Sequence, residues 1–165
     1  MSESTRLADQ IRRAFEGEAW HGDSVLEILQ GVKALTAAAR PVKHAHTIWE
    51  LVLHIAAWDE AVRQRAMGKV VTLSDRENFP PVIDTAEGAW CQALDYLKKT
   101  HAGLVETVAG FPESRLGSQV AGKSEPYYTF FYMFSGIVQH ELYHGGQIVL
   151  LKKAFADLMS SAVAD

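Results

Sequence analysis

Residues 140–144 read HELYH, so two histidines stand four positions apart and a glutamate follows the first of them. Imidazoles at this spacing lie on one face of a helix and can bind one metal ion together. The same string is the His-Glu-x-x-His pattern of zinc proteases, in which the glutamate acts as general base. His140 and His144 are therefore the first candidates for chemistry in this chain.

The residues after the motif do not fit a protease. Zinc proteases of this type need a third ligand, usually downstream, and the longer signature continues with a glycine and then a histidine. This chain has Gln147 and Leu150 at those positions, and no histidine or glutamate follows His144. A five-residue pattern with two free positions also arises by chance. The protease interpretation is therefore not favoured, and a third ligand has to be sought upstream.

The two histidines interrupt an apolar stripe on the helix expected around them. At about 100° per residue, that stripe contains Phe130, Met133, Ile137, His140, His144, Ile148 and Leu151. A lone histidine on an apolar face is more often a core residue with hydrogen-bonded nitrogens. Two adjacent ones each need partners when buried, and a shared metal ion satisfies one nitrogen on both.

His54 is the third candidate ligand. It lies at the edge of a second apolar stripe, made by Ile48, Leu51, Ile55, Trp58 and Val62. This placement suits a core-facing ligand from a neighbouring helix. The alternative, a buried histidine bonded to a carbonyl, stays open for His54 taken alone.

Four further residues have weaker claims. Gln147 is one turn beyond His144 and could hydrogen-bond a ligand in a pocket. His21 stands in the turn Trp20-His21-Gly22, where it could contact substrate at a bundle end or simply begin a helix. His101 lies on a mostly polar stretch and is expected in solvent, whereas Cys91 is expected to be a buried small residue.

The elements that must position these residues are helical, because the apolar periodicity is helical nearly throughout. Helices are expected over 4–16, from 23 or 24 towards Pro41, over 48–68, 84–109 and 128–154. Thr47 and Glu50 form a capping-box pattern that begins the third of these. Long loops separate the later helices, at 69–83 and 111–126. The prediction is an all-α four-helix bundle with crossover loops, a single domain over 1–165.

Composition narrows the class of protein. The net charge is −4 and there is no basic run, so nucleic-acid binding is not favoured. No stretch approaches the roughly 20 apolar residues of a membrane-spanning helix. The N-terminus lacks the apolar core of a secretory signal, and a single cysteine suits a reducing compartment. A cytoplasmic location is expected.

The segments HTIWELVLHIAAWDE and QHELYHGGQIVLLKK, together with AWHGDSVLEILQGV and NFPPV, resemble the DinB-like superfamily, which includes YfiT-type metal-dependent hydrolases. The resemblance extends over most of the chain. It implies a four-helix bundle of unusual helix order. It also implies a divalent metal ion, typically nickel or zinc, held by His54, His140 and His144 with open positions for water or substrate.

The resemblance implies a function as well. Characterised relatives include transferases and isomerases that use low-molecular-weight thiols such as bacillithiol or mycothiol, and many pair as homodimers. The expectation is a metal-dependent hydrolase or thiol transferase that acts on a small molecule, with the catalytic residues unknown and Gln147 and His21 as candidates. The alternative is a non-catalytic bundle with a structural metal ion or a binding role in a stress response.

Overall fold

The computed structural model describes the backbone of residues 1–164 and the side chains of residues 1–161. Its helices are α1 (Glu3–Glu16), α2 (Val25–Leu29), α3 (Ala34–Ala38), α4 (Ile48–Ala66), α5 (Asp75–Asn78), α6 (Glu87–Ala109), the 3-10 turn η1 (Glu113–Arg115) and α7 (Phe130–Ala164). Over this part of the chain there is no β-strand, only an isolated bridge between Gln119 and Thr129. The predicted all-α class is confirmed. No described helix is both long and apolar enough to cross a membrane.

Local hydrogen bonds begin several helices at the residues that the sequence indicates. The Thr47 hydroxyl accepts from the amide of Glu50, and the Glu50 carboxylate accepts from the amide of Thr47, so the predicted capping box is confirmed. Ser24 and Ser74 begin α2 and α5 in the same way. Each box satisfies two amides that have no partner inside the helix.

Two regions differ from the prediction. The loop over 69–83 contains a short helix, α5. The last helix, expected to run to about Ala154 with a tail that either adds a turn or frays, continues to Ala164. The tail after Ala154 contains three alanines, one leucine and one methionine, residue types that favour helix even without a packing partner. Asp165 lies outside the described residues.

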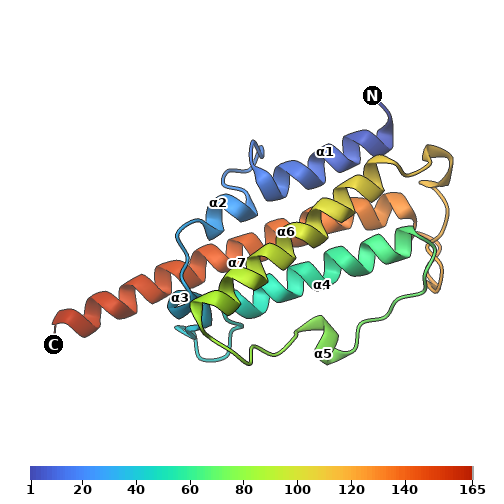
Figure 1. Cartoon of the computed structure of the whole chain (residues 1–165). Coiled ribbons are helices and arrows are strands. Elements are labelled where there is room, and N and C mark those ends of the chain that lie inside the picture. The colour runs from blue at the N-terminus through green and yellow to red at the C-terminus, as the bar shows by residue number, and fades with distance from the viewer. Residues whose placement is uncertain (165) are drawn as a thin grey trace.

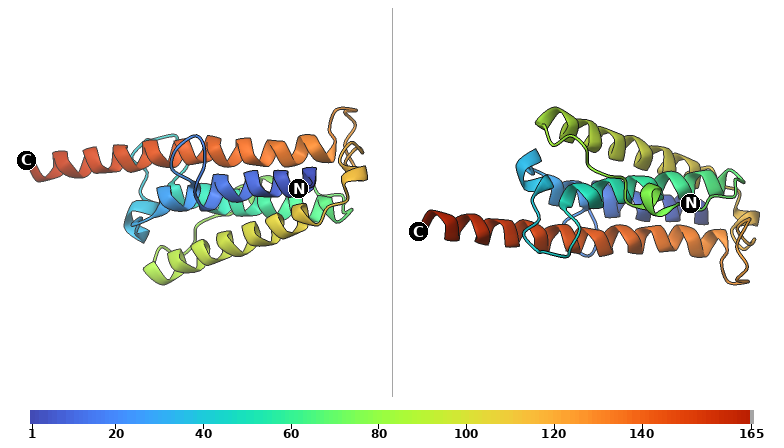
Figure 2. Two further views of the ribbon diagram at one scale, coloured as in Figure 1. Left: turned by 90° about the horizontal axis from the view of Figure 1, so that it is seen from above. Right: turned by 90° about the horizontal axis from the view of Figure 1, so that it is seen from below.

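The four long helices are not arranged in chain order. α4 packs against α6 and α7, and α1 packs against the same two helices. The order around the bundle is therefore α1, α6, α4, α7, so the consecutive long helices α1 and α4 lie on a diagonal, as do α6 and α7 (Figure 1). Figure 2 shows that the end of α7 extends beyond the other helices. The α2–α3 segment makes the diagonal crossing from α1 to α4, and the segment 110–129 makes the one from α6 to α7, whereas the loop after α4 joins two neighbouring helices.

A polar layer divides the bundle core into two apolar halves. One half includes Leu97 of α6 and the other includes Leu104, about two turns further along the same helix. Between them lie Asp59 of α4, His101 of α6 and Glu141 of α7, which are 0%, 1% and 0% exposed. The three residues come from helices that face one another across the bundle axis.

Candidate metal centre

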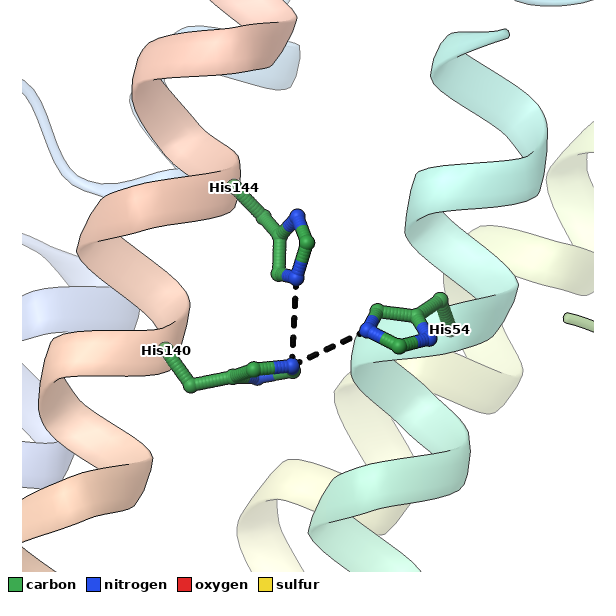
Figure 3. Close-up of side chains that lie close together, drawn as sticks. All are labelled: His54, His140 and His144. Atoms are coloured by element: carbon green, nitrogen blue, oxygen red, sulfur yellow. Dashed lines mark hydrogen bonds between the residues drawn. The ribbon is translucent and has the colours of Figure 1, made fainter. Parts of the chain in front are cut away.

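His54 from α4 meets His140 and His144 from α7, and the three rings point towards a common centre (Figure 3). The Nε2 atom of His140 lies 3.0 Å from that of His54 and 3.1 Å from that of His144. Ligand atoms held about 2.0–2.1 Å from one tetrahedral metal ion are separated by roughly 3.3 Å. The histidine nitrogens are therefore nearly at the spacing that a shared ion would impose.

Hydrogen bonds fix the outer nitrogens of two of the rings. His54 Nδ1 donates to the backbone carbonyl of Asn78 at 2.7 Å, and His144 Nδ1 donates to the side-chain oxygen of Gln147 at 2.7 Å. A neutral imidazole carries one proton, so the Nε2 atoms of both rings present lone pairs towards His140. A proton on His140 could satisfy only one of them, whereas one cation satisfies all three rings. The residues fit a divalent metal ion.

The protonation of the rings suits this role. Burial lowers the pKa of His54 to about 4. Burial, together with repulsion from a charged His144 or His54, lowers the pKa of His140 to about 3. Burial lowers the pKa of His144 as well. All three imidazoles are neutral at pH 7, which is the form that binds metal ions.

The segment that follows α4 supports one side of the cluster. Besides accepting from His54, Asn78 accepts from the indole Nε1 of Trp58 with its side-chain oxygen at 2.8 Å. The Phe79 ring stacks on His54, with centroids 4.1 Å apart, and on His46, with centroids 3.8 Å apart. The long loop thus fixes the tautomer and the orientation of a candidate ligand.

A family model of the DinB superfamily matches residues 19–148, a span that contains all three histidines. The chain belongs to the DinB superfamily. No curated protein and no solved structure matches it. For this member of the superfamily, the particulars of the site therefore come from its own geometry.

The DinB bundle opens beside the three histidines into a pocket of about 460 Å³. Its other walls are Trp58, Val62, Asn78, Tyr128, Tyr132, Met133, Gly136, Ile137 and Tyr143. Among the described residues that line it there is no carboxylate, lysine or arginine. The volume suits a small molecule, and the walls suit one with an apolar or aromatic body.

Gln147 and His21, the two candidate catalytic residues, lie in different surroundings. Gln147 contacts the cluster directly, through His144. His21 is exposed and lines surface hollows beside α1 and α7, not the pocket of the three histidines. Gln147 therefore orients a candidate ligand, and nothing places His21 near the same reacting groups.

Two expectations about burial are wrong. His101 is not in solvent but in the bundle core, where it stacks on Phe15 with ring centroids 3.8 Å apart. Lys98 and Lys99 lie on the outer face of α6, while His101 itself faces inward. Cys91 is exposed, because it lies on the outer face of the same helix.

The cluster of Asp59, His101 and Glu141 is a second group with metal-ligand chemistry, and sequence reasoning missed it. A signal was present, because each residue interrupts an apolar stripe at the same register. Asp59 follows Ile55 by four positions, His101 follows Leu97 by four, and Glu141 follows Ile137 by four. Each therefore faces the same way as an apolar core residue one turn earlier.

Proposed function

We propose that this DinB-superfamily protein is a metal-dependent enzyme, either a hydrolase or a low-molecular-weight-thiol transferase, that acts on a small molecule. The observation that carries the proposal is the position of three convergent Nε2 atoms in the wall of an open pocket. Catalytic metal sites keep a side open to substrate, whereas structural sites are closed by protein ligands.

The protein's own residues would hold the metal ion and orient the side chains that bind it. Three neutral imidazoles supply donors without charge, and Asn78 and Gln147 hold two of the rings in the tautomer that leaves Nε2 free. When bound, a divalent ion with neutral ligands keeps its full charge and acts as a Lewis acid that lowers the pKa of a nearby water or thiol. Nickel or zinc suits imidazole donors.

The pocket walls indicate the kind of substrate. Trp58, Tyr128 and Tyr132 offer aromatic faces, and no described lining residue offers a fixed charge. We infer a neutral substrate with an apolar or aromatic body and one electrophilic group that reaches the histidines. The lack of a carboxylate in the lining assigns activation of the nucleophile to the metal site rather than to a side-chain base.

The metal-binding part of the proposal is tested by elemental analysis of untagged protein. His54→Ala and His140→Ala are each expected to abolish loading of the three-histidine site, since each leaves only two ligands. The matched control is His44→Ala, which changes an exposed histidine outside the cluster. Binding at this site that is unchanged in both ligand variants would refute it.

The reaction is tested with a panel of small thiols and an electrophilic aromatic acceptor, run beside aromatic esters and amides, with and without added Ni²⁺ or Zn²⁺. Thiol-dependent turnover that is lost in His140→Ala assigns a transferase, and thiol-independent turnover assigns a hydrolase. The absence of turnover in every arm, with metal bound, would favour a non-catalytic role such as a binding module.

We also propose that two copies of the chain associate through the projecting part of α7. Leu158 and Met159 on this part of the helix are 55% and 45% exposed, and neighbouring exposed apolar side chains mark a surface for protein–protein contact. Sedimentation analysis should give a dimer, and Leu158→Glu should shift it towards monomer. A wild-type monomer at all concentrations would contradict this, without bearing on the metal centre.

A further inference from the structure

All four long helices meet at the second buried cluster. α4 contributes Asp59, α6 contributes His101, α7 contributes Glu141, and Phe15 of α1 covers one face of the histidine ring. His101 Nδ1 lies 3.4 Å from Asp59 Oδ2 and 3.2 Å from Glu141 Oε1. One nitrogen therefore faces two carboxylates that come from different helices.

The polar atoms of this cluster have no hydrogen-bond partner among the described residues. This holds for both oxygens of Asp59, both oxygens of Glu141 and both ring nitrogens of His101. The short contacts of Nδ1 lack hydrogen-bond geometry. Buried polar groups in folded proteins are almost always paired, and an unpaired buried carboxylate is costly. A partner outside the described residues must offset the cost of burying these polar groups.

We propose that Asp59, His101 and Glu141 form a second metal site, which holds a divalent first-row transition-metal ion inside the bundle. Two carboxylates and a neutral imidazole carry two negative charges, which one divalent ion balances. Ligands about 2.1 Å from a tetrahedral ion are separated by about 3.4 Å, close to both measured contacts of Nδ1. Carboxylates and histidine on facing helices are a known way to build metal sites in bundle cores.

The site has a structural character. Its three ligand residues are at most 1% exposed, so a second oxygen of a carboxylate, rather than a small-molecule ligand, completes the coordination. A ligand set of two carboxylates and one imidazole suits Zn²⁺ or Mn²⁺. Glu141 borders a surface hollow of about 300 Å³ that His21 and Asp23 also line, but its side chain is not exposed there. Bound by the three ligand residues, the ion would join α4, α6 and α7 between the two apolar halves.

The competing explanation is a polar layer without metal, in which protons are shared among the three side chains. The test is the number of ions retained after metal-free protein is refolded with Zn²⁺ or Mn²⁺ and gel-filtered. Wild-type protein is expected to retain about two ions per chain, since both clusters bind only in the folded state. The double variant His54→Ala/His144→Ala, which leaves the second cluster intact, is expected to retain about one.

Glu141→Gln and Asp59→Asn remove one charged ligand each without changing shape, and each should lower the wild-type value by one ion. A folded double variant with no ion, or wild-type stoichiometry in both amide variants, would overturn the second site. If instead the three-histidine site fails to bind, the wild type retains one ion, which the double variant keeps and Glu141→Gln loses. Circular dichroism of each variant shows whether it is folded.

Discussion

The two buried clusters of this protein share two helices and differ in almost every other respect. His140 and Glu141 are consecutive in α7, but the first faces the open pocket and the second faces the bundle axis. The three histidines are neutral donors whose outer nitrogens are mostly hydrogen-bonded. Asp59, His101 and Glu141 at the bundle axis form the axial cluster, which contains charges and has no hydrogen bonds among the described residues.

The difference shows how one pair of helices serves two purposes. Successive residues on a helix point about 100° apart, so one face can line a pocket while the next enters the core. The three histidines beside the pocket form the pocket cluster. Removing one of them should cost little stability, because water in the pocket can replace the missing side chain. Removing a member of the axial cluster should cost more, because no water reaches it to replace a missing partner.

Removing one member of each cluster from metal-free protein should change the free energy of unfolding very differently in the two cases. Asp59→Ala leaves Glu141 and His101 without their third partner and should lower the free energy of unfolding by about 3–5 kcal/mol. His54→Ala, beside the open pocket, should cost only about 1 kcal/mol. Urea unfolding followed by circular dichroism, in the presence of a chelator, measures both. Equal losses would mean that the two clusters do not differ in this way.

The next largest effect concerns the residues that orient the pocket ligands. Gln147→Leu removes the acceptor of His144 Nδ1, so the ring can turn or change tautomer. Metal affinity at the three-histidine site should fall by about 10–100-fold, as measured by competition with a chromogenic chelator. Gln139→Leu, an exposed residue two turns earlier on α7, is the matched control and should leave affinity unchanged. An equal change in both variants would remove the orienting role.

The clusters should also have opposite effects on the pH dependence of stability in metal-free protein. Burial lowers the pKa of His54 to about 4 and of His140 to about 3, below the ordinary value of 6.5. The unfolded chain then binds more protons, so these groups reduce stability as the pH falls from about 6.5 towards 4. His54→Ala should flatten this acid limb.

In the axial cluster the pH dependence of stability has the opposite sign. Burial alone would lower the pKa of His101, but the carboxylates of Asp59 and Glu141 outweigh it and raise the value to about 9. Burial raises the pKa of Glu141 to about 8 from 4.5. The folded chain binds more protons here, so stability falls as the pH rises towards 8 and 9. Glu141→Gln should flatten this alkaline limb, as measured by urea unfolding at a series of pH values, and a limb unchanged in that variant would contradict the assignment.

The sequence predicts one cluster far better than the other for a physical reason. His140 and His144 are four apart on one helix, so local geometry alone brings them together, and His54 is near a capping box whose position is plain. The axial cluster draws one residue from each of three helices. Its assembly depends on the order α1, α6, α4, α7, which no local pattern contains.

The error at His101 has the same origin. Lys98, Lys99 and Thr100 make its surroundings polar in sequence, yet Leu97 and Leu104 place it on the inward face. Whether that face is buried depends on Asp59 and Glu141 across the bundle. The end of α7 is hard to predict for a related reason: residues 156–161 are exposed, so their sequence carries no amphipathic signal from packing.

The smallest predicted effect tests how the loop supports the pocket cluster. Asn78 holds His54 with its backbone carbonyl and Trp58 with its side chain, so Asn78→Ala removes only the second bond. Unfolding free energy should fall by about 1 kcal/mol, the net value of one hydrogen bond, while metal affinity stays nearly unchanged. Phe79→Ala, which removes the ring stacked on His54, should lower metal affinity more than Asn78→Ala does, because the imidazole then loses the surface that holds its plane. Chelator competition on the two variants compares them directly, and a larger loss of affinity in Asn78→Ala would show that the side chain, and not the backbone and the aromatic stack, orients the ligand.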